Sequence, residues 1–510
     1  MNTAQFFELL KLAGPEALIT LTALAALLVD LMVMQGAPLR ARRGIATLLT
    51  VVGCVAAGLY LVQVPVRATV VGGLFTVDAL TQLVKLGLVG LTGLTAMLSF
   101  EADYTDHVGE HFALLLLATV GLMIMASAAD LVLVFLGLEL AGLSLYPLVA
   151  LNKASPRATE AALKYFFFGA LAAAFTLFGF SFLYGLTGTT HLAGIATALH
   201  GRGPDPLLAV AVGMSLVGFG FKVAVVPFHL WAPDAYQGAP TPVAALIASG
   251  SKLAGFFLLG RFVALTLPEA SGANTAGVAA GWVRVVAALA LASMVAGNLA
   301  ALAQRDFKRL LAYSAVAHAG YLLLAVLALS GAVHRTAAFA ALVYYGMTYA
   351  LAGLGAFAAA SHLERRAGDA ALNRLVGLGR RAPWVAGGLA VFLLSLAGLP
   401  PLAGFPAKFY VFAAALESGP VAGTPFWLVV AALGLSPVGF YYYLRVLKLA
   451  WVVAEDSTPA PASPESDPAA AGRPIETVVT LLAAAGVLLL GVFPEWLLGP
   501  LRAAIQQAGW

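Results

Sequence analysis

Long apolar runs separated by short polar segments dominate this chain. Each run extends for about 17–25 residues or slightly more, the length that an α-helix needs to cross a bilayer. The runs are continuous and lack the alternation of apolar and polar positions that is typical of a membrane β-barrel. We therefore predict an all-α polytopic membrane protein with about 14 transmembrane helices. The expected spans lie near residues 15–34, 44–64, 78–99, 112–128, 130–151, 160–185, 205–236, 240–266, 277–303, 307–331, 336–361, 385–416, 424–449 and 474–498.

Composition supports this class and limits the chemistry. Of 510 residues, 61% are hydrophobic and only 10% are charged, whereas soluble domains carry about 25% charged residues. The single cysteine, Cys54, excludes an internal disulfide and a cysteine-ligated iron–sulfur cluster. No motif that binds a nucleotide or a metal is recognisable, and the N-terminus lacks the basic cluster of a cleavable signal. Any redox chemistry is therefore expected to belong to partner proteins.

Lysine and arginine are shared unequally between alternate loops. With fourteen spans, about sixteen of them fall on one side and about five on the other, so the positive-inside rule makes the richer side cytoplasmic. Both termini then face the outside. The net charge of +4 thus reports topology, and we expect contact with lipid and none with nucleic acid. The basic residues of the cytoplasmic side are Arg40, Arg42, Arg43, Lys153, Arg157, Arg305, Lys308, Arg309, Arg365, Arg366, Arg374, Arg380, Arg381, Arg445, Lys448 and Arg473.

Two of the expected spans contain proline breaks. Pro227 and Pro233 interrupt the seventh span, and Pro400, Pro401 and Pro406 interrupt the twelfth. The breaks are five helices apart, which favours two repeats of five, spans 4–8 and 9–13. Because five is odd, the second repeat enters the membrane from the opposite side, and inverted repeats with matching broken helices are typical of transporters.

This pattern divides the chain into five parts. A Pro/Ala/Ser-rich stretch from Glu455 to Arg473 is typical of a flexible linker and separates the last span from the repeats. The expected parts are N-terminal helices 1–3 (residues 1–110), the first repeat (111–266), the second repeat (267–450), a cytoplasmic linker (451–473) and the C-terminal helix (474–510).

Lysines adjoin both breaks. Lys222 ends an apolar run five residues before Pro227, where the negative dipole end of a half-helix suits an ammonium group. Lys408 follows the Gly398–Pro401 break in what reads as the matching arrangement. A lysine in lipid costs roughly 2.5–3.5 kcal/mol on insertion scales. For Lys408 the alternative is a side chain that extends to the membrane surface, but this does not explain why both lysines adjoin breaks.

Two further charges are expected near the middle of the membrane. Lys252 lies about twelve residues into the eighth span, roughly 18 Å along a helix. Glu139 lies similarly deep in the fifth span. It is either the counter-ion of one lysine or a lone protonated carboxyl group, and pairing lowers the cost of both charges.

The remaining candidates are less specific. Lys164 follows Glu160 by four residues, so it is either part of the path or half of a helical ion pair. His229 and His318 are either proton relays or packed, hydrogen-bonded histidines. Three further charged residues in the spans are expected to serve contacts between helices or subunits: Asp30, Lys85 and Arg261.

Together these residues form a row of one carboxylate and three lysines along the middle of the membrane. Burial and a neighbouring positive charge favour loss of a proton from a lysine, whereas a nearby carboxylate favours its retention. A lysine held between these influences takes up a proton when paired and releases it when the pair opens. This chemistry requires no metal.

Three long segments carry a family resemblance. In order along the chain they are Lys222-x4-Pro227-Phe228-His229-x-Trp231-x-Pro233-Asp234-x-Tyr236-x-Gly238-Ala239-Pro240-Thr241-Pro242-Val243, then Arg305-Asp306-Phe307-Lys308-Arg309-Leu310-Leu311-Ala312-Tyr313-Ser314, then Gly398-Leu399-Pro400-Pro401-Leu402-Ala403-Gly404-Phe405-x-x-Lys408-Phe409. They resemble the antiporter-like membrane subunits of respiratory complex I and of Mrp-type cation/proton antiporters.

Other segments resemble the N branch of the bacterial proton-pumping NADH:quinone oxidoreductase rather than its L or M relatives. They are Glu139-Leu140 with Leu145-Tyr146, Lys164-Tyr165-Phe166, and Ala317-His318-Ala319-Gly320-Tyr321.

The resemblance implies a role and partners. It implies a bacterial inner-membrane subunit that moves protons through Glu139, Lys222, Lys252 and Lys408. The complex would use NADH, FMN, iron–sulfur clusters and quinone in other subunits, and no cofactor in this chain. The implied neighbours are subunit M and the small membrane subunits.

Two alternatives remain at this point. The first is a subunit of a sodium/proton antiporter without redox partners. The second is a structural scaffold in which the buried charges only hold helices together; the depth of Lys252 and the two matched breaks argue against it.

Overall fold

The computed structural model describes residues 11–63, 67–70, 73–101, 103–201, 205–271, 281–331, 335–419, 423–453 and 474–508. Thirteen helices in these ranges are long and apolar enough to cross a membrane. The remaining expected span, 385–416, is present as two short helices, so the prediction of about 14 spans and the all-α class are confirmed. The linker expected at 455–473 lies outside the described residues.

The helices follow the expected spans closely. They are α2 Gly14–Leu28 (continued by the π-helix η1 Val29–Val33), α3 Leu39–Gln63, α4 Ala79–Phe100, α5 Val108–Ser127, α6 Leu131–Val149, α7 Pro156–Thr187, α8 Leu192–Leu199, α9 Pro206–Val223, α10 Ala232–Gly238, α11 Thr241–Leu246, η2 Ile247–Ser251, α12 Lys252–Thr266, η3 Glu269–Ser271, α13 Trp282–Leu302, α14 Phe307–Ala328, α15 Arg335–Ala367, η4 Leu372–Leu375, α16 Leu378–Arg381, α17 Pro383–Ala397, α18 Gly404–Glu417, α19 Thr424–Trp451, α20 Pro474–Val492 and α21 Glu495–Gln507.

Polar residues at the helix starts explain several boundaries. The Asp78 side chain accepts from the backbone N–H of Thr81 at the start of α4, and Ser155 accepts from Ala158 at the start of α7. Asp306 accepts from the backbone of Arg309 at the start of α14. Each side chain satisfies a backbone donor that the helix leaves unpaired at its first turn.

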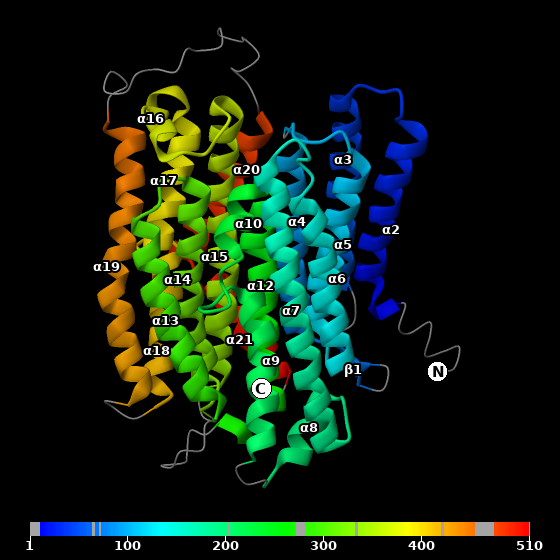
Figure 1. Ribbon diagram of the computed structural model, residues 1–510, viewed down its shortest axis with the longest axis vertical. Helices are drawn as coiled ribbons and strands as arrows, with labels where there is room; N and C mark the ends of the chain where they lie inside the picture. Colours follow the sequence, from blue (N-terminus) through cyan, green and yellow to red (C-terminus); the bar gives the residue numbers. More distant parts are fainter. Residues whose placement is uncertain are drawn as a thin grey trace.

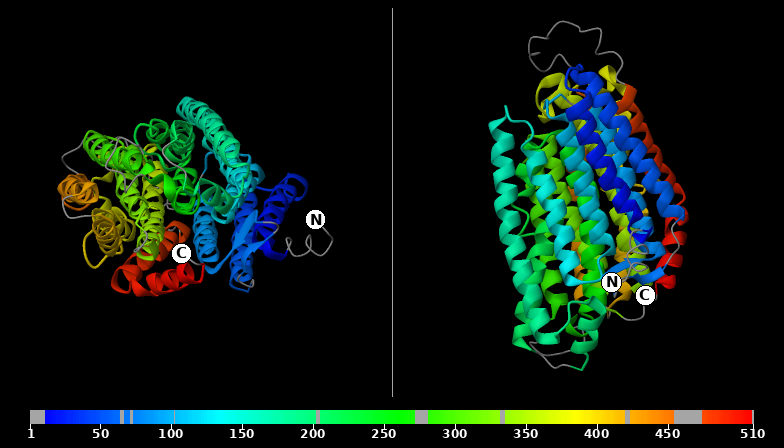
Figure 2. Two further views of the ribbon diagram at one scale, coloured as in Figure 1. Left: turned by 90° about the horizontal axis from the view of Figure 1, so that it is seen from below. Right: turned by 90° about the vertical axis from the view of Figure 1, so that its right-hand side faces the viewer.

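The spans run roughly upright and side by side (Figure 1). Helices α2 and α3 form one flank, and α19 lies at the opposite flank; the view from below shows the same order (Figure 2). The α11–α12 segment, α14 and α15 are the most deeply buried spans. Helix α15 packs against α12, α14, α17, α18 and α20, so it is the central helix of the second half.

Both predicted breaks are present. The seventh span ends as α9 at Val223 and resumes as the short α10, and the twelfth is divided into α17 and α18. The eighth span contains the π-helical turn η2 immediately before Lys252. The inversion of the two repeats and the division into five parts stay predictions.

Three elements are absent from the sequence-based prediction. A short antiparallel hairpin joins β1 (Arg67–Val70) to β2 (Phe75–Val77). Helix α8 is apolar but only eight residues long, and α21 is amphipathic, so a search for long apolar runs passes over both.

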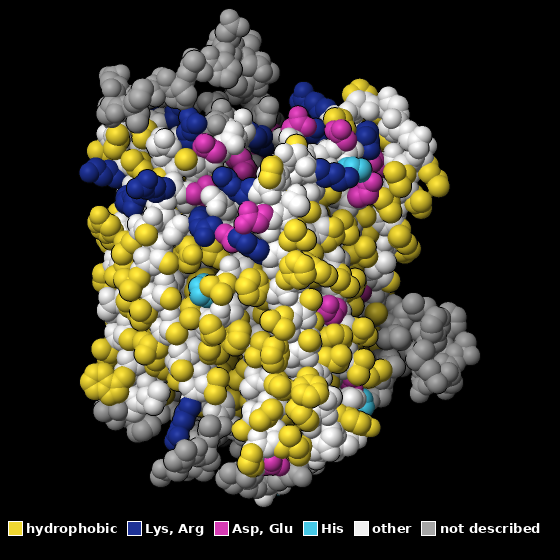
Figure 3. All heavy atoms as spheres, viewed as in Figure 1, with side chains coloured by type: hydrophobic (Ala, Val, Ile, Leu, Met, Phe, Trp, Pro, Cys, Tyr) yellow, Lys and Arg dark blue, Asp and Glu magenta, His cyan; other side chains and the backbone are white. Residues whose placement is uncertain are grey.

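Charged side chains gather at one end of the molecule. In Figure 3 most Lys, Arg, Asp and Glu side chains of the visible face lie toward the upper end, and the middle and lower parts are predominantly apolar. This asymmetry agrees with the unequal distribution of loop charges.

Candidate functional site

Lys222 lies in the last turn of α9, next to the break. The chain leaves the helix through Ala224, which has a left-handed backbone with φ of +57°. The carbonyl group of Phe221 accepts from the backbone N–H of Ala224 at 3.1 Å and from the indole N–H of Trp231 at 3.1 Å. The lysine is therefore held at the negative end of a half-helix, as predicted, with only 6% of its surface exposed.

Glu139 and Lys222 line one small cavity. The cavity lies between α6, α7 and α9, and its lining includes Tyr146, Tyr165 and Thr176. Glu139 is half-buried there. The described ion pairs do not include Glu139 with Lys222, so the two charges face each other across the cavity without direct contact. This geometry suits a pair that opens and closes.

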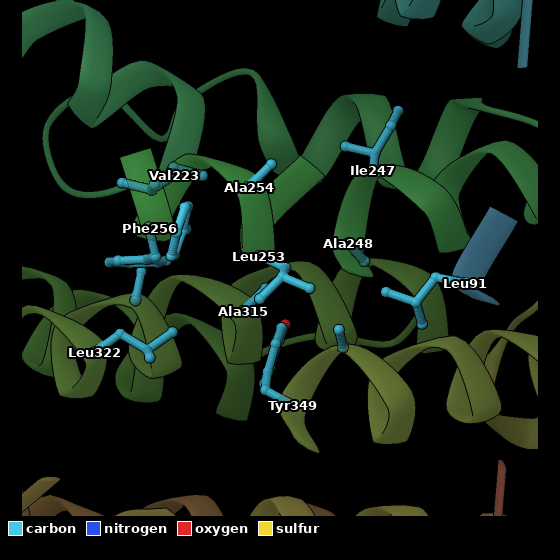
Figure 4. Packing of buried hydrophobic residues seen from close by; sticks show 14 of the residues in the cluster. Leu91, Val223, Ile247, Ala248, Leu253, Ala254, Phe256, Ala315, Leu322 and Tyr349 are labelled. Atoms are coloured by element: carbon cyan, nitrogen blue, oxygen red, sulfur yellow. The ribbon is translucent and has the colours of Figure 1, made fainter. Parts of the chain in front are cut away.

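The next lysine of the row, Lys252, lies on α12, which packs against α9. Helices α9 and α12 meet where Val223 and Ala254 are labelled in Figure 4. A Cβ atom placed on Gly255 would lie 3.3 Å from Cγ of Lys222, so the absence of a side chain at Gly255 permits this close approach. Lys252 lies three residues earlier in the same helix, about one turn away.

Lys252 is buried among α12, α14 and α15. Its ammonium group donates to the backbone carbonyl of Ala315. It also lies 5.3 Å from the ring centre of Tyr349. Figure 4 shows Tyr349 projecting from α15 toward Leu253 and Ala315. These contacts stabilise a charge without an acidic partner.

His318 connects this region to the second half. Its Nδ1 lies 2.8 Å from the Tyr345 hydroxyl, and its Nε2 lies 3.1 Å from the Tyr443 hydroxyl. The His318 ring centre is 5.0 Å from that of Tyr349, the ring that also faces Lys252. His318 therefore lies between Lys252 and the next lysine, with polar partners on both ring nitrogens.

Lys408 occupies the second break. Its ammonium group donates to the carbonyl of Ala397 at 2.8 Å and to Ser436 Oγ at 3.3 Å. With His318 and Tyr349 it lines a second small cavity.

The two breaks hold their lysines differently. Lys222 lies before its break, whereas Lys408 follows its break and reaches back to the end of α17. The backbone of Lys222 and the ammonium group of Lys408 each lie at the C-terminal end of a first half-helix. Gly398, with φ of +90°, forms the turn; a Cβ there would lie 2.9 Å from Cδ of Lys408.

Two candidates lie outside this row. Lys164 pairs with Glu160 at 2.7 Å, as the helical spacing predicts, and with Asp234 at 2.8 Å. His229 lies in the segment between α9 and α10, half-buried, with its ring centre 6.5 Å from that of Tyr313. The structure places neither residue in the two cavities.

The three charged residues expected at helix contacts are found there. Asp30 bonds Arg42 at 2.6 Å, and Lys85 bonds Glu16 at 2.6 Å. Arg261 donates to the carbonyl of Ala126. These pairs join neighbouring helices and lie apart from the row.

Other charged residues near the site were not singled out from the sequence. Asp234 accepts from Arg309 of α14 at 2.5 Å in addition to Lys164. The adjacent Lys308, 1% exposed, donates to the carbonyl of Ala239 at 2.7 Å. These bonds fix both ends of the 234–239 segment. The Arg305–Ser314 motif that carries part of the resemblance was the available signal.

Taken together, the arrangement can pass protons but does not form a metal site. Titratable groups follow one another from α6 through α9, α12 and α14 to α18. Within the described ranges, no group of three His, Cys, Asp or Glu residues could hold a metal ion.

Comparisons with known proteins agree with this geometry. Residues 128–434 match the family described as NADH:quinone oxidoreductase/Mrp antiporter, TM. The chain is 45% identical to NADH-quinone oxidoreductase subunit N 2 of Acidobacterium capsulatum, over 98% of this chain and 100% of that protein. Respiratory complex I from Thermus thermophilus with bound aureothin contains a chain with a TM-score of 0.77 and 35% identity, covering 96% of this chain and 100% of that one.

A chain of the Mrp complex from a Dietzia species has a TM-score of 0.78 but only 21% identity, over 98% of this chain and 97% of that one. At this identity the likeness shows the fold alone.

Proposed function

This chain belongs to the membrane-subunit family that NADH:quinone oxidoreductases share with Mrp antiporters, and we propose that it moves protons as subunit N of NADH:quinone oxidoreductase. The observation that carries the mechanism is the continuous row of buried titratable groups from Glu139 to Lys408. Electron transfer from NADH to quinone takes place in partner subunits, and this chain contributes the proton path to the enzyme.

The first step is a change of pairing at the α9 break. Lys222 holds its proton while Glu139 is close, because an opposite charge favours the ammonium form. When the pair separates across their shared cavity, the dry surroundings favour the neutral amine, and the proton leaves. Movement of the half-helix end at Ala224 would change this separation.

The second step carries the proton across the centre. Lys252 receives it and passes it toward His318, through the region where Tyr349 contacts both side chains. A neutral imidazole accepts a proton at one ring nitrogen and donates at the other. His318 is therefore assigned to the path as a relay, and Lys408 connects it to the exit side.

Lys164 and His229 receive other assignments. Lys164 fixes α10 through Asp234, so it supports the break rather than carrying the proton. His229 lies beside Tyr313, away from the cavities, and is assigned to the packing of the α9–α10 connection.

The surrounding complex supplies what this chain lacks. NADH, FMN, iron–sulfur clusters and quinone would be held by other subunits, and subunit M and the small membrane subunits would adjoin this one. The richly charged end of the molecule would face the cytoplasm of a bacterial inner membrane, with both termini on the outer side.

The test replaces Lys222 by alanine in the intact complex. The expected result is loss of proton pumping per NADH oxidised, measured in inverted membrane vesicles, with assembly followed on native gels. Lys448→Ala, at an exposed position near the end of α19, is the matched control and should pump normally. Unchanged stoichiometry in Lys222→Ala would refute the assignment. A scaffold role would instead appear as loss of assembly without a change in protons per electron.

The antiporter alternative receives less support. The Mrp relative shares the fold at 21% identity, whereas the subunit N relative is 45% identical over its whole length. NADH-driven activity of the purified assembly separates the two functions.

A further inference from the structure

We propose that Asn298, a neutral residue of α13, is a positioning residue for proton transfer between His318 and Lys408, and that it acts through Tyr321. The inference rests on the proposed function. Asn298 is 1% exposed, lies outside both cavities and has no charge, so it is neither a donor nor an acceptor of the transported proton.

Three hydrogen bonds fix the Asn298 amide. Its Nδ2 donates to the carbonyl of Met294 at 2.8 Å and to the Tyr321 hydroxyl at 3.1 Å. Its Oδ1 accepts from the Tyr442 hydroxyl at 3.4 Å. Because a carbonyl group can only accept, the bond to Met294 requires the nitrogen on that side and leaves the oxygen for Tyr442. The amide therefore has one orientation, which holds α14 and α19 against α13.

Tyr321 is the residue through which this orientation reaches the proton path. The ammonium group of Lys408 lies 5.2 Å from the centre of the Tyr321 ring. The ring also meets His318 edge-on, with centres 5.7 Å apart and an angle of 85° between the planes. A single aromatic ring thus borders both titratable groups, and its hydroxyl is directed toward Asn298.

The ring face matters because it stabilises only one protonation state. The quadrupole of an aromatic face attracts the ammonium form of Lys408 and not the neutral amine. A ring that tilts away weakens this attraction and also releases the edge contact with His318. Asn298 maintains the tilt by holding the hydroxyl at the far end of the ring.

The packing around Asn298 is shaped for this arrangement. A Cβ atom on Gly439 of α19 would lie 3.3 Å from Oδ1 of Asn298 and 3.6 Å from the Tyr442 hydroxyl. The small residue leaves the space in which the amide and the tyrosine meet.

Local hydrogen bonding alone does not account for asparagine at this position. The buried hydroxyl groups of Thr95, Ser215 and Ser249 each donate to the carbonyl four residues earlier in their own helices. Asn298 makes the same bond to Met294 and, in addition, reaches two tyrosines on other helices. Serine would satisfy the local requirement but would not reach Tyr321.

The experiment compares three substitutions in the intact NADH:quinone oxidoreductase. Asn298→Ser keeps the bond to Met294, Asn298→Leu keeps the volume, and Tyr321→Phe keeps the ring but removes the hydroxyl. Protons pumped per NADH are measured in inverted vesicles, with the amount of assembled complex determined on native gels. We expect each variant to assemble and to lose about two- to tenfold in proton transfer, the size of a weakened cation–π contact.

The double variant Asn298→Leu/Tyr321→Phe decides the route. If Asn298 acts through Tyr321, the double variant is no worse than either single variant, since interacting residues are not additive. The inference is overturned if the losses of the two single variants add up in the double variant. It is also overturned if Asn298→Ser or Asn298→Leu pumps normally. Lys408→Ala is measured alongside: if it pumps normally, the proposed function fails; if it alone is defective, only the role of Asn298 fails.

Discussion

Replacing Gly398 by alanine should disable Lys408 without removing it. Gly398 forms the turn of the second break with φ of +90°, and an added Cβ would lie 2.9 Å from Cδ and 3.3 Å from Nζ of Lys408. Ordinary carbon contacts lie at about 3.5–4.0 Å, so the lysine must move by roughly 0.6–1.1 Å. Its bond to Ala397, now 2.8 Å long, would then lengthen to about 3.4–3.9 Å and weaken or break.

The expected effect of Gly398→Ala has two separable parts, one on assembly and one on pumping. An L-residue in a left-handed conformation costs about 1–2 kcal/mol, and this strain lowers the amount of assembled subunit. A hydrogen bond from a charged group contributes about 1.5–3 kcal/mol. Since about 1.4 kcal/mol is a factor of ten, its loss lowers the proton affinity of Lys408 by about 10- to 150-fold and should reduce the rate of pumping.

Two other glycines of the chain separate these parts. Gly188 also has positive φ, +69°, but its Cβ would meet nothing within 4 Å, so Gly188→Ala carries the strain alone. Gly387 lies within α17 and likewise has open space around it, so Gly387→Ala introduces neither the backbone strain nor the contact with Lys408. Vesicle pumping with parallel NADH oxidation and native gels is the assay. Normal protons per NADH in Gly398→Ala, or an equal loss in Gly188→Ala, would refute the reasoning.

Three further substitutions test the support of the first break. Trp231→Phe removes one of the two donors to the Phe221 carbonyl, which also accepts from the backbone N–H of Ala224. A hydrogen bond contributes about 0.5–1.5 kcal/mol net, so the subunit should show a lower thermal midpoint in solubilised complex and reduced pumping in vesicles. An unchanged midpoint would contradict this. Asp234→Ala removes the partly exposed ion pairs with Lys164 and Arg309. Because exposed ion pairs contribute little, the amount of assembled complex on native gels should fall no more than about twofold. Complete loss of assembly would show that the two pairs contribute more than their exposure implies. Ala224→Gly relieves a left-handed alanine, which should raise the thermal midpoint by relief of about 1 kcal/mol or more; a lower midpoint would contradict the assigned strain.

The architecture could be predicted from the sequence because the sequence features that determine it are local. Span length follows from continuous apolar runs. The first broken helix follows from Pro227, and the second follows from Gly398 and Pro400. The expected depths of Lys252 and Glu139 follow from counting residues along helices. Amphipathic α21 and the β1–β2 hairpin, with strands of only 4 and 3 residues, had no such signal, since neither contains a long apolar run.

The details of the site depend on partners that are far apart along the chain. The position of Lys408 after its break could be read from the sequence, but its bond back to the carbonyl of Ala397 at the end of α17 could not. No spacing rule predicts that Asn298 bonds Tyr321, or that Trp231 caps the carbonyl beside Lys222. Candidate residues were selected from the sequence by their charge, so neutral side chains such as Asn298 were not among them. In a dry interior, however, the orientation of neutral polar groups determines which charges are stable.

The two breaks bring a lysine to the C-terminal end of a half-helix by different routes. The backbone of Lys222 belongs to the last turn of α9, whereas the Lys408 side chain extends back to the carbonyl of Ala397 at the end of α17. Under the proposed function, each break favours the charged lysine only while the half-helix end keeps its shape. Opening or closing either break would then change proton affinity without any change of residue, which would give a conformational signal from the redox subunits a direct means of driving proton release.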